Sequence, residues 1–399
     1  MFAVKTELSC ANPFAQSHRS ERLDATFAQI SRRMQTSHQN HLGYPYNLSF
    51  TPGVPAALGG YLINNLGDPY AGSHYASEVC AQEREAIAWL MRLWGCHNLD
   101  NFWGSIGASG TEGNLWGLYL GREKLPDAVL FYSADAHYSL PKAARILRIP
   151  AVQVASHPNG ELDLADFADQ LVILKGRPVI VALTCGTTMK GAHDDISGAL
   201  FTLASAGYDS DRRYVHVDGA LNAMVVPFLQ HVPAAILPSF EAEIDSLSTS
   251  GHKMIGTPMP CGALVARKPH VARIERAVAY LRSNDTTMMG SRNGHAVLAV
   301  WARLFGHGYG GYAHDALQSV NRAQALADRL RGLGADVLCN PYSLTVVFPE
   351  PSDHIVRTYQ LACNQGLAHG IVMPSVTEHL LERFVDDYAA WWAGKAKGH

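Results

Sequence analysis

Lys253 lies in a segment whose residue types could support covalent chemistry. The segment from 248 to 253 reads STSGHK and follows a short stretch that we expect to be a strand. A lysine amine becomes a nucleophile when it is held rigidly and partly desolvated, because burial disfavours its ammonium form. Neighbouring hydroxyls such as that of Ser250 could hold a phosphate. The segment predicts a lysine that forms a Schiff base, although a loop lysine taken alone is usually a solvated side chain.

Asp218 ends the apolar run YVHVD, which begins at Tyr214. A carboxylate at the end of a buried strand costs free energy unless a cation meets it. The protonated nitrogen of a pyridine ring would be such a cation, and the carboxylate would keep that ring an electron sink, as in pyridoxal 5′-phosphate (PLP). The alternative is a structural Asp218 that caps the next helix.

The stretch GASGTEGN, at residues 107–114, leads into a helical run at 115–121. Glycines let the backbone approach an anion, hydroxyls donate hydrogen bonds to it, and the N-terminus of a helix adds a favourable dipole. We therefore predict that Ser109, Gly110 and Thr111 surround a phosphate group. The alternative is an ordinary helix start with Thr111 as its cap.

Two further motifs follow predicted strands. The sequence DAHYS at 135–139 places His137 where its imidazole could stack on a flat cofactor, although a packed or exposed histidine is the commoner case. The sequence GTT at 186–188 could aim the Thr187 hydroxyl at the phenolic oxygen of the cofactor, or it could form a plain turn.

The elements that must position these residues alternate between strand-like and helical stretches. The strand-like stretches are residues 128–133, 151–155, 178–184, 214–217, 246–248 and 261–266. The helical stretches are residues 78–94, 111–124, 139–147, 164–175 and 196–206. This alternation predicts an α/β fold with a mainly parallel sheet that is covered on both faces. Open sheets of this kind bind ligands at the carboxyl ends of their strands, which is where all of these motifs fall.

The chain is long enough for more than one domain. We predict an N-terminal helical segment at 1–45, a large PLP-binding domain at 46–270 and a small C-terminal α+β domain at 271–399. The small domain is expected to contain helical stretches at 294–305, 312–333 and 378–392 and a strand at 344–348.

Composition narrows the class of protein. The 399 residues are 47% hydrophobic and 17% charged with a formal net charge of −3, which fits a globular enzyme and provides no basic surface for nucleic acid or an anionic membrane. The seven cysteines are odd in number and show no C-x-x-C spacing, so neither a disulfide framework nor a metal site is predicted. We expect a cytoplasmic protein, since the sequence shows no apolar leader segment and no membrane span.

Longer stretches of the sequence show a resemblance to a known family. They are INNLGDPY (63–70), SGTEGNLWGLYLGRE (109–123), AHYSLPKAARILRI (136–149), CGTTMKGAHDD (185–195), HVDGAL (216–221), SGHKMIGTPMPCG (250–262) and GSRNGHA (290–296). In these the chain resembles the group II PLP-dependent amino-acid decarboxylases, which have the PLP-dependent transferase fold (fold type I). It is most similar to the histidine decarboxylase and serine decarboxylase subgroup.

The resemblance implies a role for each motif residue. Lys253 forms the Schiff base with PLP, Asp218 pairs with the pyridine nitrogen, and His137 stacks on the ring and steers the substrate. The residues implied around the phosphate are Ser109, Gly110, Thr111, Ser250 and His252. Thr187 lies near the phenolic oxygen, and the substrate-binding residues are expected to include Tyr70 and His295.

The resemblance also implies assembly and a set of candidate proton donors. The active site of the family lies at a dimer interface, so we expect a homodimer or a higher homo-oligomer, with residues 286–292 reaching into the partner's site. The acid that protonates Cα after loss of carbon dioxide could be Lys253, His137 or Tyr280, and the sequence does not choose among them.

The implied function is the conversion of a small L-amino acid to its primary amine and carbon dioxide. Gly219, directly after Asp218, and the sequence GDPY favour serine over histidine as the substrate, with histidine as the alternative. The motifs would also suit an aminotransferase or lyase of the same fold, or a non-catalytic protein with a vestigial cofactor pocket. Cys261, in the PCG turn, fits a structural thiol better than the nucleophile of a desulfurase.

Overall fold

The structure is a computed structural model, in which the chain divides into two compact units, residues 1–41 and residues 42–399. The described residues are 19–49, 56–72, 74–174 and 176–396. In this described part, no helix combines the length and the apolar character that a membrane crossing requires.

The described residues of the first unit form the helix α1 (Arg19–Gln39), within the predicted N-terminal helical segment. Its apolar residues Leu23, Phe27, Ile30 and Met34 recur every three or four positions, so they share one face of the helix. A single helix cannot bury such a face by itself. The first eighteen residues of the predicted segment lie outside the described residues.

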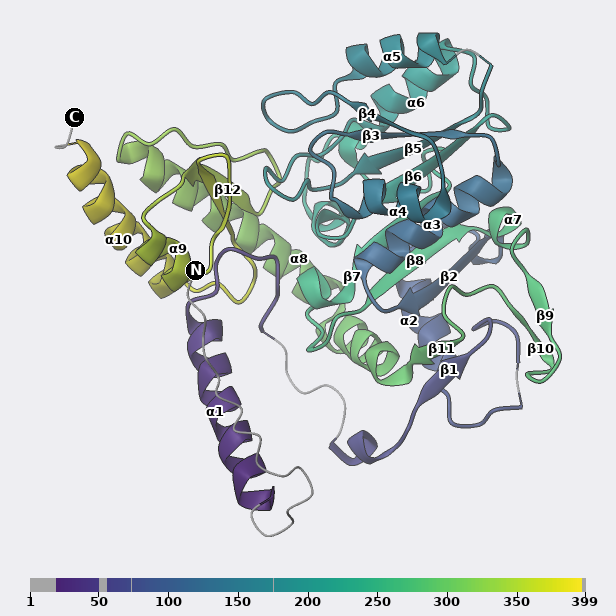
Figure 1. The fold of residues 1–399 in the computed structure, drawn as a ribbon, viewed down its shortest axis with the longest axis horizontal. Coiled ribbons are helices and arrows are strands. Elements are labelled where there is room, and N and C mark those ends of the chain that lie inside the picture. The colour runs from purple at the N-terminus through teal and green to yellow at the C-terminus, as the bar shows by residue number, and fades with distance from the viewer. Residues whose placement is uncertain (1–18, 50–55, 73, 175, 397–399) are drawn as a thin grey trace. The chain divides into compact units, whose positions relative to one another are not determined.

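A seven-stranded sheet forms the centre of the second unit, with the strand order β2-β8-β7-β6-β5-β3-β4 (Figure 1). Its strands are β2 (Phe102–Gly107), β3 (Val129–Ser133), β4 (Ala151–Val154), β5 (Val179–Thr184), β6 (Arg213–Asp218), β7 (Ser246–Ser250) and β8 (Gly262–Arg267). Strands β4, β3, β5, β6 and β7 run parallel, and β8 is antiparallel to both β7 and β2. The predicted mainly parallel sheet is confirmed, and β2 is a strand that the sequence analysis missed.

Helices cover both faces of this sheet (Figure 1). They are α2 (Cys80–Leu93), α3 (Gly110–Lys124), α4 (Ser139–Leu147), α5 (Leu164–Ile173), α6 (Ile196–Ser205), α7 (Lys268–Val271) and α8 (Gly294–Gly332). Strand β5 shows why two layers are needed. Val179, Val181 and Leu183 belong to the hydrophobic cluster that includes residues of α2, α5, α6 and α8, whereas Ile180 and Ala182 belong to the cluster that includes residues of α3, α4 and α7. A strand that is apolar at every position must be buried on both sides.

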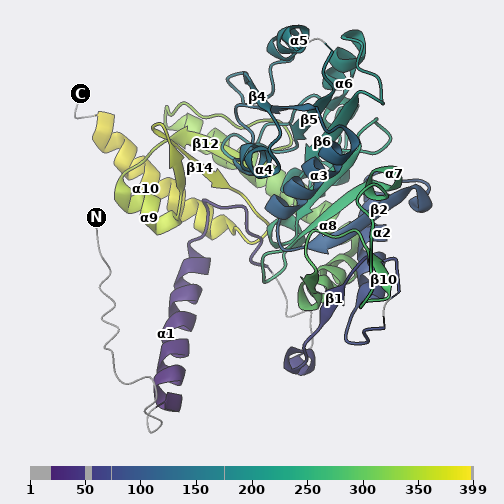
Figure 2. The same cartoon turned by 45° about the vertical axis from the view of Figure 1, so that its right-hand side comes forward.

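The C-terminal part has a different architecture. Its three-stranded antiparallel sheet has the order β12-β14-β13, with β12 (Thr345–Pro349), β13 (Ala362–Asn364) and β14 (Leu367–Ile371). Helices α9 (Asp353–Tyr359) and α10 (Glu378–Ala396) lie beside this sheet in Figure 2. These elements fit the expected α+β character, whereas the domain boundaries at 45/46 and 270/271 stay a prediction.

The helix α8 replaces two predicted helices. It runs from Gly294 to Gly332 and is kinked at Gly308, whose backbone has φ 67° and ψ 175°. Such a positive φ is readily adopted only by glycine, so the glycine-rich interval between the predicted helices became a kink and not a loop.

Two short ladders and several single turns complete the fold. The ladders pair β1 (Asn64–Leu66) with β11 (Ser291–Asn293), and β9 (Arg276–Val278) with β10 (Ser283–Asp285). The 3₁₀ turns are η1 (Ala56–Gly60), η2 (Leu99–Asn101), η3 (Asn222–Met224), η4 (Val226–Phe228) and η5 (Ala234–Ile236). A single π-helical turn, η6 (Gly251–Ile255), follows β7.

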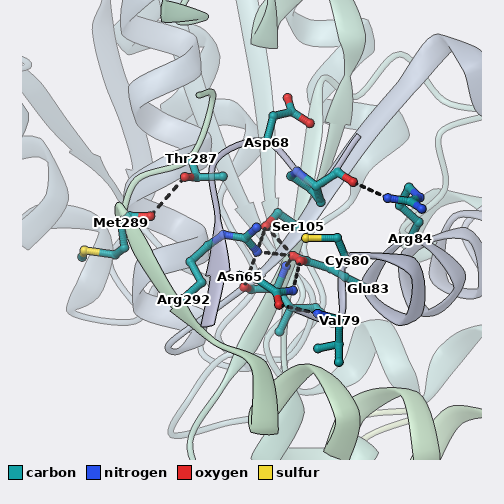
Figure 3. A network of polar contacts seen from close by, with 12 residues as sticks. Asn65, Asp68, Val79, Cys80, Glu83, Arg84, Ser105, Thr287, Met289 and Arg292 are labelled. Carbon is teal, nitrogen blue, oxygen red and sulfur yellow. Dashed lines mark hydrogen bonds and ion pairs between the residues drawn. The ribbon is translucent and has the colours of Figure 1, made fainter. Parts of the chain in front are cut away.

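A buried ion pair joins α2 to β11 (Figure 3). The side chains of Glu83 and Arg292 are almost fully buried, and the Arg292 guanidinium contacts the Glu83 carboxylate directly. Glu83 also accepts hydrogen bonds from Asn65 Nδ2 at 2.7 Å, Ser105 Oγ at 2.7 Å and the backbone N of Ile106 at 2.8 Å. The Arg292 side chain is held inside its own chain by this pair, and the expectation that residues 286–292 reach a partner's site stays a prediction.

Candidate active site

A cavity of about 400 Å³ lies at the carboxyl ends of the parallel strands. The predicted site residues that line it are Ser109, Gly110, Thr111, His137, Thr187, Asp218, Ser250, His252 and Lys253. They follow β2, β3, β5, β6 and β7, so the topology of the sheet brings together motifs that are far apart in sequence.

Lys253 lies in the single π-helical turn that follows β7. Its backbone, with φ −88° and ψ −121°, departs from helical geometry inside that turn. Burial lowers the pKa of the Lys253 amine, and the negative charge of Asp218 offsets part of this shift. A desolvated amine with a lowered pKa is more often in its neutral, nucleophilic form than a surface lysine.

Asp218 is the last residue of β6 and is 3% exposed. Its Oδ2 accepts a hydrogen bond from Asn114 Nδ2 at 2.7 Å, and its Oδ1 accepts one from the backbone N of Ala220 at 3.0 Å. Among the residues that the structure describes, no cationic side chain forms an ion pair with this carboxylate. A buried carboxylate that faces a cavity with only neutral donors has room for a cation from a ligand.

The start of α3 fits an anion. Ser109 caps this 15-residue helix by accepting from the backbone N of Glu112 at 3.2 Å, so the cap is Ser109 and not Thr111. A Cβ at Gly110 would overlap the hydroxyl of Ser250, so only glycine allows the helix start to come this close to β7. Backbone N–H groups, hydroxyls and the positive end of the helix dipole meet at this corner of the cavity.

His137 follows β3 and lines the same cavity. Its Nδ1 lies 2.7 Å from Ser139 Oγ and accepts from the backbone N of Ser139 at 3.2 Å. Burial lowers the pKa of His137, Asp218 raises it in part, and Lys253 lowers it further. These effects favour a neutral imidazole, which can lie against a flat ring without the cost of a buried charge.

Thr187 and His252 are held by backbone contacts. Thr187 is 1% exposed, and its Oγ1 accepts from the backbone N of Ala192 at 3.0 Å, which leaves the hydroxyl hydrogen for another acceptor. His252 Nδ1 lies 3.2 Å from the backbone O of Cys261, and its ring centroid lies 5.7 Å from that of Tyr46.

The residues around the cavity fit PLP: a carboxylate without a cation of its own, a desolvated amine and a helix start shaped for an anion. The family model for the pyridoxal-dependent decarboxylase conserved domain matches residues 121–349. The chain belongs to this family. It is an enzyme of the carboxy-lyase class, and its cofactor is PLP.

Relatives of known activity cover nearly the whole chain. Serine decarboxylase 1 of Oryza sativa subsp. japonica is 40% identical over 98% of this chain and 81% of its own. Histidine decarboxylase of Solanum lycopersicum is 36% identical over 92% of this chain and 88% of its own. A crystal structure of L-methionine decarboxylase from Streptomyces sp. 590 is 25% identical, with a TM-score of 0.86 over 95% of this chain and 96% of its own. The predicted fold type and enzyme class of this decarboxylase are thereby confirmed.

Two predicted substrate-binding residues of the decarboxylase do not line its cavity. Tyr70 packs near Trp103, with ring centroids 6.5 Å apart, and His295 Nε2 lies 2.9 Å from the backbone O of Tyr61 near the start of α8. Their role in substrate binding stays a prediction. Tyr280, a candidate proton donor, is 87% exposed and also lies away from the cavity.

The interpretation of Cys261 as a structural thiol fits its surroundings in this decarboxylase. Cys261 is fully buried, and its Sγ lies 3.3 Å from Thr257 Oγ1. Burial raises the pKa of the thiol to about 11. A thiol with a raised pKa is a poor nucleophile, because the thiolate is the reactive form.

The sequence analysis missed part of the cavity wall. Asn114 was part of the GASGTEGN stretch but was given no role of its own, yet it lines the cavity and binds Asp218. Its position within the GTEGN stretch was the signal that could have identified it. Tyr46, His369 and Ile371 complete the wall from segments outside the central sheet, and nothing in their local sequence indicates this.

Proposed function

We propose that this decarboxylase converts L-serine to ethanolamine and carbon dioxide. The reaction class rests on one observation, the cavity in which a desolvated Lys253 faces the same space as a buried Asp218 whose described partners are neutral. The choice of serine is supported by the similarity to serine decarboxylase 1, which exceeds that to histidine decarboxylase in both identity and coverage of this chain. Gly219 after Asp218 supports the same choice.

Each residue around the cavity has a part in holding PLP. Lys253 binds the aldehyde carbon through Nζ, and Asp218 holds a proton at the pyridine nitrogen. The start of α3 binds the phosphate, together with the hydroxyl of Ser250 and with His252. His137 would lie against the ring face, and Thr187 would donate to the phenolic oxygen. When bound, PLP supplies an electron sink for the bond between Cα and the carboxylate.

The chain supplies the proton that replaces the carboxylate at Cα. Lys253 Nζ would be a free amine in the cavity whenever it does not hold the cofactor. Because burial lowers the pKa of the Lys253 amine, its ammonium form gives up a proton more readily than that of a surface lysine. Lys253 lines the cavity and Tyr280 does not line that of its own chain, which supports Lys253 as the donor.

A panel of the twenty standard amino acids tests the substrate. Holoenzyme should release carbon dioxide and one primary amine, with ethanolamine from serine as the fastest product. Formation of keto acid in place of carbon dioxide would indicate an aminotransferase. Lys253→Ala should lose the visible absorbance of the lysine-bound cofactor together with activity, and a yellow, fully active variant would contradict the role of Lys253.

L-Histidine is the second candidate substrate. It is favoured by the 36% identity to the histidine decarboxylase of Solanum lycopersicum over 92% of the chain. The same panel separates the two candidates, because histidine would yield histamine. If kcat/KM for histidine exceeds that for serine, the proposed substrate is wrong while the reaction class stands.

The proposed assembly is a homodimer. The apolar face of α1 supports it, since a second copy of the chain offers a surface that could cover Leu23, Phe27, Ile30 and Met34. Sedimentation should give a mass close to twice 43.3 kDa. A particle of one chain at all concentrations would contradict the dimer.

The proposed location is the cytoplasm. The described cysteines support it, because all of them are free thiols and disulfides are rare in reducing compartments. Fractionation of the source cells should recover the protein with cytoplasmic markers, and recovery with secreted proteins would contradict this location.

A further inference from the structure

Asn114, the fifth residue of α3, uses its full hydrogen-bonding capacity. Its Nδ2 donates to Asp218 Oδ2 at 2.7 Å and to Ser139 Oγ at 2.8 Å. Its Oδ1 lies 2.7 Å from Ser248 Oγ and 3.0 Å from His216 Nε2. A carboxamide offers two hydrogens and two lone pairs, so no capacity is left over. The side chain is 1% exposed, which makes Asn114 a buried junction between four segments.

The direction of each bond follows from Asp218. An ionised carboxylate only accepts, so the NH₂ group of Asn114 must face it and the carbonyl oxygen must face His216 and Ser248. His216 therefore carries a proton on Nε2, and its Nδ1 can accept from Ser246 Oγ at 2.8 Å. Burial lowers the pKa of His216 to about 4, in agreement with a neutral ring.

The orientation of the Asn114 amide also fixes the position of the proton on His137. Ser139 Oγ accepts from Asn114, so its own hydrogen is free to bind His137 Nδ1 at 2.7 Å. The backbone N of Ser139 donates to the same Nδ1 at 3.2 Å. A ring nitrogen that receives two donors cannot also carry a proton. The hydrogen of neutral His137 therefore lies on Nε2.

Two glycines allow Asn114 to reach these partners. A Cβ at Gly117 would overlap the ring of His216, and a Cβ at Gly113 would lie 2.8 Å from Ser248 Cβ. Both glycines lie within a turn of Asn114, on the helix that packs against β6 and β7. Only the absence of these side chains lets α3 come close enough for the Asn114 amide to bridge the two strands.

We propose that Asn114 is a positioning residue that holds the Asp218 carboxylate for the cofactor and, through Ser139, keeps His137 as a neutral ring with its proton on Nε2. This inference rests on the roles proposed above for Asp218 and His137. His137 then offers a hydrogen-bond donor to the substrate and is not the source of the Cα proton, because a neutral imidazole is a very weak acid. The proton is left to Lys253.

Cofactor affinity tests the first half of the proposal. Asn114→Asp keeps the shape of the side chain and an oxygen that can still accept from Ser248 and His216. It also puts a second carboxylate beside Asp218, so one of the two carboxylates must take up a proton. We expect the Kd for PLP to rise roughly 10- to 100-fold, as is typical when a group that supports a ligand's partner is lost. An unchanged Kd would overturn the proposal.

Asn65→Asp is the matched control. Asn65 is equally buried, donates to Glu83 Oε2 at 2.7 Å and accepts from the backbone N of Val79 at 2.9 Å, away from the cavity. The substitution also places a carboxylate beside a carboxylate. We expect its Kd for PLP to change less than about twofold, since the two networks share no residue. An equal loss of affinity in both variants would show a general effect of buried charge and overturn the proposal.

The tautomer of His137 tests the second half. In holoenzyme labelled with ¹⁵N-histidine, the ring signals that disappear in His137→Asn identify this residue. We expect them to show a protonated Nε2 and a bare Nδ1. Ser139→Ala should leave the Kd for PLP within about twofold, because Asn114 still holds Asp218. It should also move part of the His137 population to the tautomer protonated on Nδ1, because the 2.7 Å hydroxyl contact is lost and only the longer 3.2 Å contact from the backbone N of Ser139 remains.

Ser139→Ala also decides the matter if Asn114→Asp does not fold. A His137 that keeps its tautomer without the Ser139 hydroxyl, or that carries the proton on Nδ1 in the wild type, would overturn the proposal. Failure of the proposed function looks different, because wild-type protein would then bind no PLP or release no carbon dioxide. If wild-type and Asn114→Asp enzymes bind PLP equally while Asp218→Asn does not, the proposed function stands and the role of Asn114 fails.

Discussion

Two buried carboxylates in this enzyme are stabilised in opposite ways. Glu83 meets the guanidinium of Arg292 inside its own chain and accepts further hydrogen bonds from neighbouring groups, as Figure 3 shows. Asp218 accepts only from the neutral donors Asn114 and Ala220 among the described residues, and it faces a cavity. The charge of Glu83 is balanced without a ligand. The charge of Asp218 has room for a cation that the described residues do not provide.

This difference separates a structural charge from a functional one. A buried charge with an internal partner contributes to the fold, and removing one partner leaves the other uncompensated. A buried carboxylate without such a partner has a cost that only a bound cation offsets, so the stability of that region is linked to the ligand. Burial and the presence of hydrogen bonds do not distinguish the two, because both carboxylates are buried and hydrogen-bonded.

The largest effect is expected from Arg292→Gln. This substitution leaves Glu83 buried without its cation, and the free energy of unfolding should fall by about 3–5 kcal/mol. Urea unfolding at saturating PLP measures this loss. Arg329→Gln is the control, since its ion pair with Glu378 is exposed and is worth about 0–1 kcal/mol. Equal losses in both variants would show that burial does not decide the strength of the Glu83 pair.

The next largest effect is expected from Asp218→Asn, and it should fall on activity. The amide cannot hold a proton at the pyridine nitrogen, so kcat/KM should fall about 10²- to 10³-fold, the usual cost of losing one electrostatic contact to the reacting group. Urea unfolding without PLP should show no loss of stability, because a buried charge has been removed. A large loss of stability without PLP would show that Asp218, like Glu83, is a structural charge that stabilises the fold.

Acid should weaken the cavity network through His216. The pKa of folded His216 is about 4, whereas a histidine in an unfolded chain has a pKa near 6.5. Between these values the unfolded chain binds the extra proton, so the contribution is complete above pH 6.5 and is lost as pH falls toward 4. The loss should approach about 3 kcal/mol.

The difference between wild type and His216→Gln isolates this contribution. Urea unfolding of both proteins from pH 7.5 to 4.5 should show a smaller decline in the variant, since it lacks the titrating ring. Parallel declines would show that His216 is not the group responsible.

The smallest effect is expected from Gly219→Ala, beside Asp218. A Cβ here would lie 2.9 Å from Leu247 Cδ1 and 2.9 Å from the backbone O of Ser248, and it would overlap Ala223 Cβ. Overpacking of this kind costs about 1–3 kcal/mol. Gly306→Ala is the control in α8, where nothing lies within 4 Å and a better helix former should add up to about 1 kcal/mol. An equally stabilised Gly219→Ala would show that the backbone around Asp218 is loosely packed.

The sequence by itself determined the central sheet and the residues that its strands carry to one edge. Lys253, Asp218 and His137 were found because each follows an apolar run, and the carboxyl ends of parallel strands meet at one side of a sheet. Periodicity and strand-end polarity are local signals, so they can be read without the fold.

Only the tertiary structure decided which of these residues are coupled. The four bonds of Asn114 reach Ser139, His216, Asp218 and Ser248, and the Glu83–Arg292 pair spans 209 positions. The sequence analysis also did not predict strand β2, the kink in α8 or the placement of His369 in the cavity wall. Such contacts depend on strand register and on how closely a helix packs, and a local pattern of residue types does not encode either one.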